Sequence, residues 1–185
     1  MIIRKRLLLC AAVLALSACG GGGGDLIEVP TVPVPNNRVL APGSYKLSFS
    51  AISTARLSSP ISGVDVAVRF PVGLSVRTLT GGTGQIASTS LTSGISIRST
   101  TLAYGNYSAS TRTAYINLAT TEDNYRGGQY LNLYFTVAAG TSVTPDTIYA
   151  LNASFPTYQV IGINAVTHST VYLTDSVKTT LGVEQ

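Results

Sequence analysis

From Ala41 to the C-terminus, the chain alternates apolar and polar residues with the two-residue period of a β-strand. Residues 45–51 read Tyr-Lys-Leu-Ser-Phe-Ser-Ala, and residues 64–70 read Val-Asp-Val-Ala-Val-Arg-Phe. No segment keeps a helical period over three turns, and the helix formers lysine and glutamate are scarce. Because successive strand side chains point to opposite faces, each such segment can bury one face. The pattern therefore predicts an all-β fold.

Further strand candidates recur at near-regular spacing, separated by Gly, Asn, Ser and Pro. They fall at residues 74–79, 95–102, 113–119, 129–138, 147–153, 160–166 and 170–175. Short strands with turn residues between them are typical of two-layer β-proteins. We expect residues 41–185 to form one Ig-like or jelly-roll β-sandwich of about nine strands.

The N-terminus carries the three parts of a secretory signal. Basic residues at positions 4–6 precede an apolar run over residues 7–16, and Ser17-Ala-Cys19 follows. The apolar run is about half of the ~20 residues that a membrane-spanning helix needs. The sequence thus predicts a cleaved signal peptide over residues 1–18.

The tetrad Leu16-Ser-Ala-Cys19 resembles the lipobox of bacterial lipoproteins. The resemblance implies cleavage before Cys19, a diacylglyceryl group on its sulfur and an acyl chain, such as palmitate, on its freed amine. Several acyl chains anchor a protein firmly, because each buried methylene contributes about 0.8 kcal/mol. Gly20, rather than an aspartate, follows the cysteine. In a Gram-negative cell this implies a lipid-anchored protein of the outer membrane, on either its periplasmic or its extracellular face.

A tether is predicted between the lipidated cysteine and the β-region. Five glycines follow Cys19, and Pro30, Pro33 and Pro35 come after them. Glycine-rich chains are flexible, whereas closely spaced prolines favour extended polyproline II. We therefore expect residues 19–40 to form a stalk that lifts the domain off the membrane.

Removal of the signal changes both the charge and the cysteine count. The formal charge of +4 includes the three basic residues of the signal, so nine basic and eight acidic residues remain and give +1. The remaining arginines are scattered along the sequence, which argues against a nucleic-acid partner. Of the two cysteines, Cys10 leaves with the signal and Cys19 takes the lipid, so we expect no disulfide.

Residue types that serve catalysis are few in the β-region. His168 is the only histidine, so neither a histidine cluster for zinc nor a recognisable Ser-His-Asp triad is expected. Five acidic residues lie in the domain, and nothing singles out a pair as the acid and base of a glycosidase. We therefore expect no enzymatic activity and no required cofactor. Glu122 and Asp123 could hold calcium through their oxygen atoms, but they lack the spacing of an EF-hand, and a polar turn is the first expectation.

Tyrosine is abundant, with ten copies against four phenylalanines and no tryptophan. In the strands predicted at residues 113–119 and 129–138, the side opposite the apolar one carries rings and amides. These residues are Tyr115, Asn117, Tyr130, Asn132 and Tyr134. If the two strands pair, the five side chains form one flat surface. Such a surface suits sugar stacking or a protein interface, and it also arises simply because tyrosine fits a pleated sheet.

Three segments resemble the cohesin family. Residues 61–76 look like its opening strand, which ends in an aromatic residue and proline before the chain turns into a second short strand. Residues 106–119 are similar to the family's following hairpin, and residues 128–140 to its strand before a Gly-rich turn. The resemblance implies a jelly-roll sandwich, again of about nine strands, shared with related carbohydrate-binding modules. It also implies a non-catalytic role.

The expected function is that of a non-catalytic, membrane-anchored binding module. Protein–protein attachment or assembly at the cell envelope is the first expectation. The alternatives are a carbohydrate-binding module that uses the surface tyrosines and a purely structural envelope lipoprotein. The expected partners are the membrane, through the lipid on Cys19, and either a protein or a polysaccharide.

Overall fold

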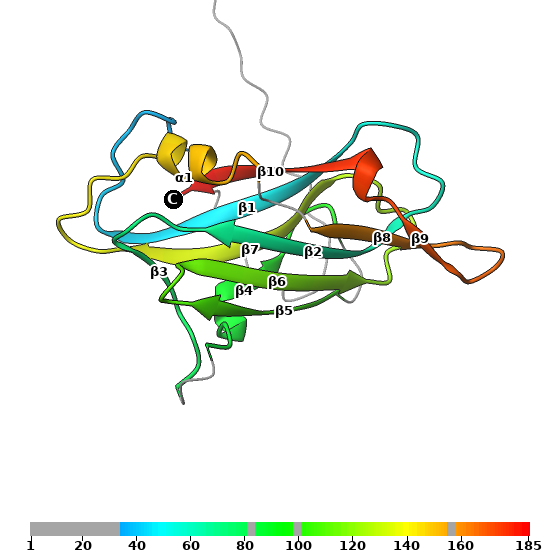
Figure 1. The fold of residues 1–185 in the computed structure, drawn as a ribbon, viewed down its shortest axis with the longest axis horizontal. Helices are drawn as coiled ribbons and strands as arrows, with labels where there is room; N and C mark the ends of the chain where they lie inside the picture. The colour runs from blue at the N-terminus through cyan, green and yellow to red at the C-terminus, as the bar shows by residue number, and fades with distance from the viewer. Residues whose placement is uncertain (1–33, 81–83, 98–100, 155–157) are drawn as a thin grey trace, which may run out of the picture. The chain divides into compact units, whose positions relative to one another are not determined.

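The computed structural model describes residues 34–80, 84–97, 101–154 and 158–185 (Figure 1). Contacts along the chain separate residues 1–30 from residues 31–185. The predicted signal peptide over residues 1–18, the lipidation site Cys19 and the first part of the predicted stalk lie outside the described residues. Within the described ranges, no helix is long and apolar enough to cross a membrane.

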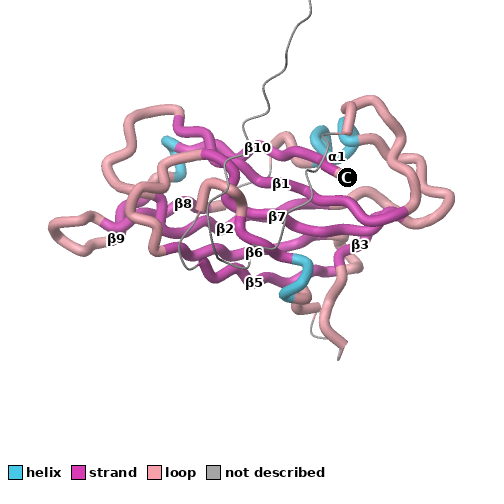
Figure 2. The backbone as a smooth tube through the Cα atoms, turned by 180° about the vertical axis from the view of Figure 1, so that it is seen from behind, coloured by secondary structure: helices cyan, strands magenta, loops and turns pink. Residues whose placement is uncertain are grey.

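Two antiparallel sheets form the domain. In the first sheet the strand order is β10-β1-β7-β3, and β4 also pairs with β7. Its strands are β1 (Gly43–Ser53), β3 (Leu74–Val76), β4 (Leu91–Ser93), β7 (Gly128–Val137) and β10 (Val177–Glu184). The long strand β1 lies between β7 and β10, as the view from behind also shows (Figure 2).

The second sheet has the strand order β5-β6-β2-β8-β9. Its strands are β2 (Ile61–Arg69), β5 (Thr101–Ser108), β6 (Thr113–Thr120), β8 (Gln159–Ile163) and β9 (Thr170–Tyr172). Short 3-10 helices at Ser88–Ser90 and Thr174–Ser176 precede β4 and β10. The prediction of an all-β sandwich is confirmed, with ten strands described where about nine were expected.

The core consists of the apolar side chains on the inner faces of the two sheets. Phe70 and Phe135 contact each other across it, with ring centroids 5.5 Å apart, and Phe49 lies 6.2 Å from Tyr130. Fully burying a side chain of this size contributes about 1.5–3 kcal/mol. A core of this composition explains how a domain without a disulfide can be stable.

The strand expected at residues 147–153 is wrong, because the chain forms a helix there, α1 (Pro145–Leu151). Its first turn is capped reciprocally: the Thr144 hydroxyl accepts from the Thr147 amide at 3.3 Å, and the Thr147 hydroxyl accepts from the Thr144 amide at 3.5 Å. Pro145 occupies the first helical position, where its missing N–H costs nothing. Because of these local bonds and the burial of Ile148, the segment is helical despite its β-like composition.

Asn152 ends α1 and fastens it to the second sheet. Its side-chain oxygen accepts from the Arg69 amide at 2.8 Å. Its side-chain nitrogen donates to the Arg69 carbonyl at 2.9 Å and to the Ile148 carbonyl at 2.8 Å. The side chain is buried, so these bonds replace those it would make to water. Helix α1 is thereby fixed against the end of β2.

The folded domain begins before residue 41, where the sequence placed its boundary. Val34 and Leu40 are both buried in the core. The Val34 amide donates to the Val183 carbonyl at 3.0 Å, and the Leu40 amide donates to the Val143 carbonyl at 2.8 Å. The described end of the predicted stalk therefore packs on the domain.

Candidate binding face

The two tyrosine-bearing strands do not pair, contrary to the arrangement on which the predicted surface depended. Tyr115 and Asn117 lie on β6 in the second sheet, whereas Tyr130, Asn132 and Tyr134 lie on β7 in the first. Strand β6 pairs with β2 and β5, and β7 pairs with β1, β3 and β4. The loop between β6 and β7 crosses from one sheet to the other, so the five predicted residues do not share a face.

Tyr130 is wholly buried, so its predicted place on an exposed face is wrong. The pairing of β1 with β7 shifts between Phe49, which faces Leu131, and Ser50, which faces Gln129. Tyr130 is the extra residue at this shift, and a bulge of this kind interrupts the alternation of side chains. The Tyr130 hydroxyl shares a 3.1 Å hydrogen bond with the Thr179 hydroxyl. Burial raises the pKa of the Tyr130 hydroxyl, an effect that the bond to Thr179 opposes.

Asn132 is also fully buried, which corrects its assignment to a binding surface. Its side-chain nitrogen donates to the Thr92 hydroxyl at 3.3 Å and to the Ser93 carbonyl at 3.2 Å, and its oxygen accepts from Gln129 at 2.8 Å. The amide therefore holds the short strand β4 on β7 and is not available to a ligand. Tyr134 is partly buried on the same strand.

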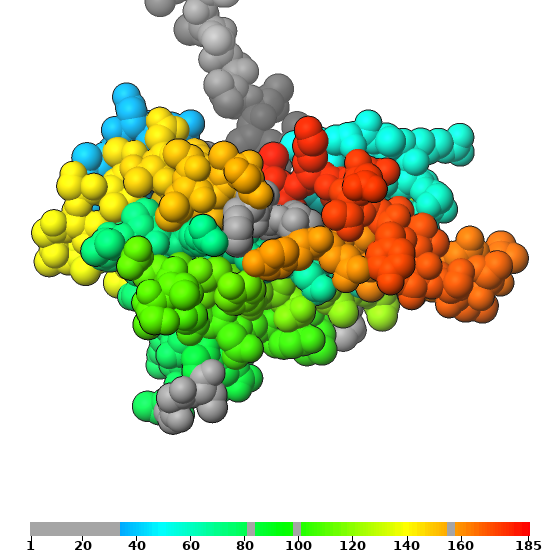
Figure 3. All heavy atoms as spheres, viewed as in Figure 1, coloured from blue at the N-terminus to red at the C-terminus, as the bar shows by residue number. Residues whose placement is uncertain are grey.

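A different surface, the outer face of the second sheet, collects exposed rings and aliphatic side chains. We call it the tyrosine face. Its largest exposed members, with their exposed fractions, are Leu102 (62%), Tyr104 (52%), Tyr115 (44%), Tyr158 (51%), Ile163 (41%) and Tyr172 (72%). The sheet's strands β5, β6, β8 and β9 present this surface to the viewer in Figure 3. Of the five predicted residues, only Tyr115 and Asn117 belong to it.

The strand register arranges this face in rows that cross the sheet. One row is apolar. In order across the sheet from β5 to β9, it consists of Leu102, Ala119, Gly63, Ile161 and Tyr172. The next row is polar and consists of Tyr104, Asn117, Asp65 and Gln159. A hollow of about 190 Å³ lies over Gly63 between the two rows. A Cβ at Gly63 would lie 2.9 Å from the Ile161 side chain, so a larger residue here would displace Ile161, which lines the hollow.

Tyr115 and Tyr158 form a stacked pair next to the polar row. Their ring centroids are 6.1 Å apart and their planes differ by 3°. The pKa of the Tyr158 hydroxyl is raised, first by desolvation and then by the neighbouring Tyr115 hydroxyl, while Arg69 lowers it. The pair is therefore a preformed aromatic surface on the tyrosine face.

The outer face of the first sheet has a different character. Lys46 and Glu184 form an ion pair of 2.9 Å across β1 and β10, and the Ser48 hydroxyl donates to the Gly182 carbonyl at 3.1 Å. Polar side chains there are thus satisfied by partners within the sheet. Exposed apolar and aromatic residues concentrate on the second sheet instead.

The loop with Glu122 and Asp123 lies near the only histidine of the chain. Glu122, Asp123 and His168 line a hollow of about 530 Å³ beyond the apolar row. Among the described residues, no three His, Cys, Asp or Glu side chains are grouped closely enough to hold a metal ion. His168 lies in the turn between β8 and β9 with a φ of 54°, and its amide donates to the Asn164 carbonyl at 2.9 Å.

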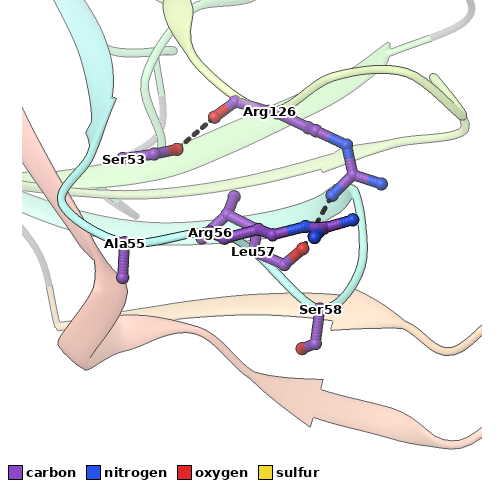
Figure 4. Close-up of a pocket in the computed structure, with 6 residues that line it drawn as sticks. All are labelled: Ser53, Ala55, Arg56, Leu57, Ser58 and Arg126. Carbon is purple, nitrogen blue, oxygen red and sulfur yellow. Dashed lines mark hydrogen bonds between the residues drawn. The ribbon is translucent and has the colours of Figure 1, made fainter.

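Two arginines that are far apart in the sequence line another hollow, of about 540 Å³ (Figure 4). Arg56 belongs to the loop after β1, and Arg126 belongs to the loop between β6 and β7. This cluster could not be predicted from the sequence, because only the topology brings these two loops together. Tyr104, Tyr158 and Tyr172 were also missed, although a correct boundary for β5 places Tyr104 beside Asn117.

Comparisons with protein-family models, with curated proteins and with solved structures found no match for this chain. The function is therefore inferred from the chain's own sequence and geometry.

Proposed function

We propose that the chain is a non-catalytic binding module, anchored to the outer membrane through lipid on Cys19, whose partner is a protein of the cell envelope. The observation that carries this proposal is the tyrosine face. It combines exposed rings with exposed aliphatic side chains on one sheet, in which each strand is hydrogen-bonded to its neighbours. Exposed apolar side chains bordered by polar residues, as here, are typical of interaction surfaces.

The aliphatic members of the tyrosine face favour a protein over a sugar as the ligand. Leu102, Ile161 and Tyr172 lie in one row, with the small residues Ala119 and Gly63 between them. An apolar side chain of a protein partner would gain about 25 cal/mol for each Å² of apolar surface removed from water there. Sugar hydroxyls placed on the same row would lose water without gaining a hydrogen-bond partner.

The resemblance to cohesins supports the same role. The three resembling segments form β2 with β3, the end of β5 with most of β6, and β7 with the turn after it. A protein-binding role inferred in this way is an analogy between folds, so the experiment has to test the surface itself.

Site-specific photocrosslinking in cells tests the proposal. A benzophenone amino acid at Tyr104 should give an adduct with one envelope protein, whereas the same group at the exposed Thr136 on the first sheet should give none. The adduct partner, once purified, should bind the Tyr104→Ala, Tyr172→Ala double variant at least about tenfold more weakly. Equal adducts from both positions, or unchanged affinity of the double variant, would remove the tyrosine face as the binding site.

Carbohydrate binding is the second candidate, and the stacked Tyr115–Tyr158 pair is the observation in its favour. Because the two rings stack on each other, less of their aromatic surface is left for a sugar. A glycan array with the wild-type chain and the Tyr115→Ala variant separates the two candidates. Binding to an array sugar that Tyr115→Ala abolishes would favour the carbohydrate module and count against the protein partner.

A further inference from the structure

The geometry points to a second binding site, for a phosphate group, in the hollow between the β1–β2 loop and the β6–β7 loop. We call it the arginine hollow; it is lined by Ser53, Ala55, Arg56, Leu57, Ser58 and Arg126 (Figure 4). None of these residues belongs to the tyrosine face. The inference is therefore independent of the proposed function.

Buried neighbours fix the backbone on both sides of the arginine hollow. Arg56 precedes Leu57, and Arg126 follows Tyr125; both of these neighbours are buried in the core. The Ser53 hydroxyl donates to the Arg126 carbonyl and so ties the two loops together. The arginine side chains thus project from loops whose ends cannot move apart freely.

The two guanidinium groups are available to a ligand. The Arg126 Nη1 donates to the Leu57 carbonyl at 3.1 Å, which orients this guanidinium toward the facing loop. A guanidinium has five N–H donors, so most of those on Arg126 are left over. Arg56 is exposed and has neither a hydrogen bond nor an ion pair from its side chain within the described residues.

Among the described residues that line the arginine hollow, the charged ones are Arg56 and Arg126, so the hollow is positively charged. No acidic residue is among the described residues that line it. Glu122 lines a neighbouring hollow with Arg126 but does not line this one. Two like charges that share a hollow repel each other, and a bound anion relieves that repulsion.

A phosphate monoester matches this arrangement better than a carboxylate. It carries a charge of about −1.5 to −2 at neutral pH and three acceptor oxygens, enough for both guanidiniums. A carboxylate carries one charge and would leave one arginine uncompensated. Arginine also binds phosphate through paired N–H donors, a geometry that lysine cannot reproduce. The phosphate could belong to a lipid headgroup or to a soluble ester, since the chemistry recognised is the same.

An NMR titration of the full chain carrying Cys19→Ser, which cannot be lipidated, tests the site. Inorganic phosphate should shift the Arg56 and Arg126 Nε–H signals with millimolar affinity. Arg56→Lys and Arg126→Lys should each weaken phosphate binding about tenfold, because charge is kept while the paired donors are lost. Arg77→Lys, a change at an exposed arginine outside the arginine hollow, should leave it unchanged. Unfolding midpoints of all variants confirm that the loops remain folded.

Two further probes distinguish the sources of the phosphate. Binding to phosphatidylcholine vesicles that contain phosphatidic acid, lost in the Arg56→Ala, Arg126→Ala double variant, would identify a lipid headgroup. If phosphoethanolamine binds, and the wild type and the double variant bind the vesicles equally, the phosphate belongs to a soluble ester. An equal response to acetate would overturn the assignment to phosphate. The site itself is overturned if phosphate leaves both arginine signals unmoved, or if the double alanine variant binds phosphate as the wild type does.

Discussion

At the scale of single residues, Asn152 shows how one side chain can join two elements. It bonds to both backbone groups of Arg69 and to the Ile148 carbonyl while almost fully buried. Sequence reasoning did not single it out, because an asparagine after an apolar stretch is equally typical of an exposed turn. Its importance depends on β2, which lies more than 80 residues earlier in the chain.

We expect Asn152→Ala to lower the free energy of unfolding by about 2–3 kcal/mol, because it removes the side-chain partner of the Ile148 carbonyl and of both Arg69 backbone groups. Urea unfolding followed by circular dichroism measures this loss. Asn124→Ala, at an exposed loop position, is the matched control and should change stability by less than about 0.5 kcal/mol. Equal stability of the two variants would show that α1 is held by other contacts.

Residue-level predictions of exposure succeeded where strands are regular and failed where they are not. Tyr115 is exposed, as the alternation in β6 predicts. Tyr130 is buried because the shift opposite Phe49 and Ser50 interrupts the alternation in β7. A bulge is set by how two strands pair, and nothing within residues 129–138 alone marks its position.

At the scale of elements, α1 shows local capping prevailing over composition. The segment Thr144-Pro-Asp-Thr147 contains both halves of a capping arrangement and a proline at the first helical position. These signals were present in the sequence, but the β-like surroundings favoured a strand. Strands β4 and β10 were missed for a different reason, since β4 is only three residues long and β10 follows a short 3-10 helix.

Thr144→Ala should lower the free energy of unfolding by about 1 kcal/mol, because the Thr147 amide loses its acceptor. Thr144→Ser keeps the hydroxyl and should retain most of the stability. Thermal unfolding of the two variants side by side makes the comparison. If alanine and serine are equally destabilising, the methyl group of Thr144, and not its hydroxyl, is what matters.

At the scale of the whole molecule, the fold class was predictable but the binding surface was not. The apolar alternation in β1, β2 and β6 is enough to predict two stacked sheets. Which strands share a sheet depends on where each loop crosses the sandwich, and the β6–β7 loop separates Tyr115 from Tyr134 for this reason. The same crossing brings Arg126 to Arg56.

Lipid anchoring is a further prediction at this scale. In a Gram-negative host, Cys19→Ser should remove the protein from the outer-membrane fraction, because the acyl chains have no attachment point. Gly20→Asp should keep it in a membrane but shift it from the outer to the inner one. Fractionation followed by immunoblotting measures both changes. A Cys19→Ser protein that stays in the outer-membrane fraction would contradict the lipid anchor.

The pairing of β1 has a mechanical consequence for the proposed anchoring through Cys19. The chain passes from Val34, bonded to Val183, through the buried Leu40 into the start of β1. Strand β1 is bound along most of its length to β10 on one edge and to β7 on the other. A pull directed along β1 would therefore load these two ladders in shear, with many hydrogen bonds resisting together, instead of opening them one at a time. In the proposed arrangement, with a lipid anchor at one end and a partner on the tyrosine face, β1 is the strand that would carry the tension.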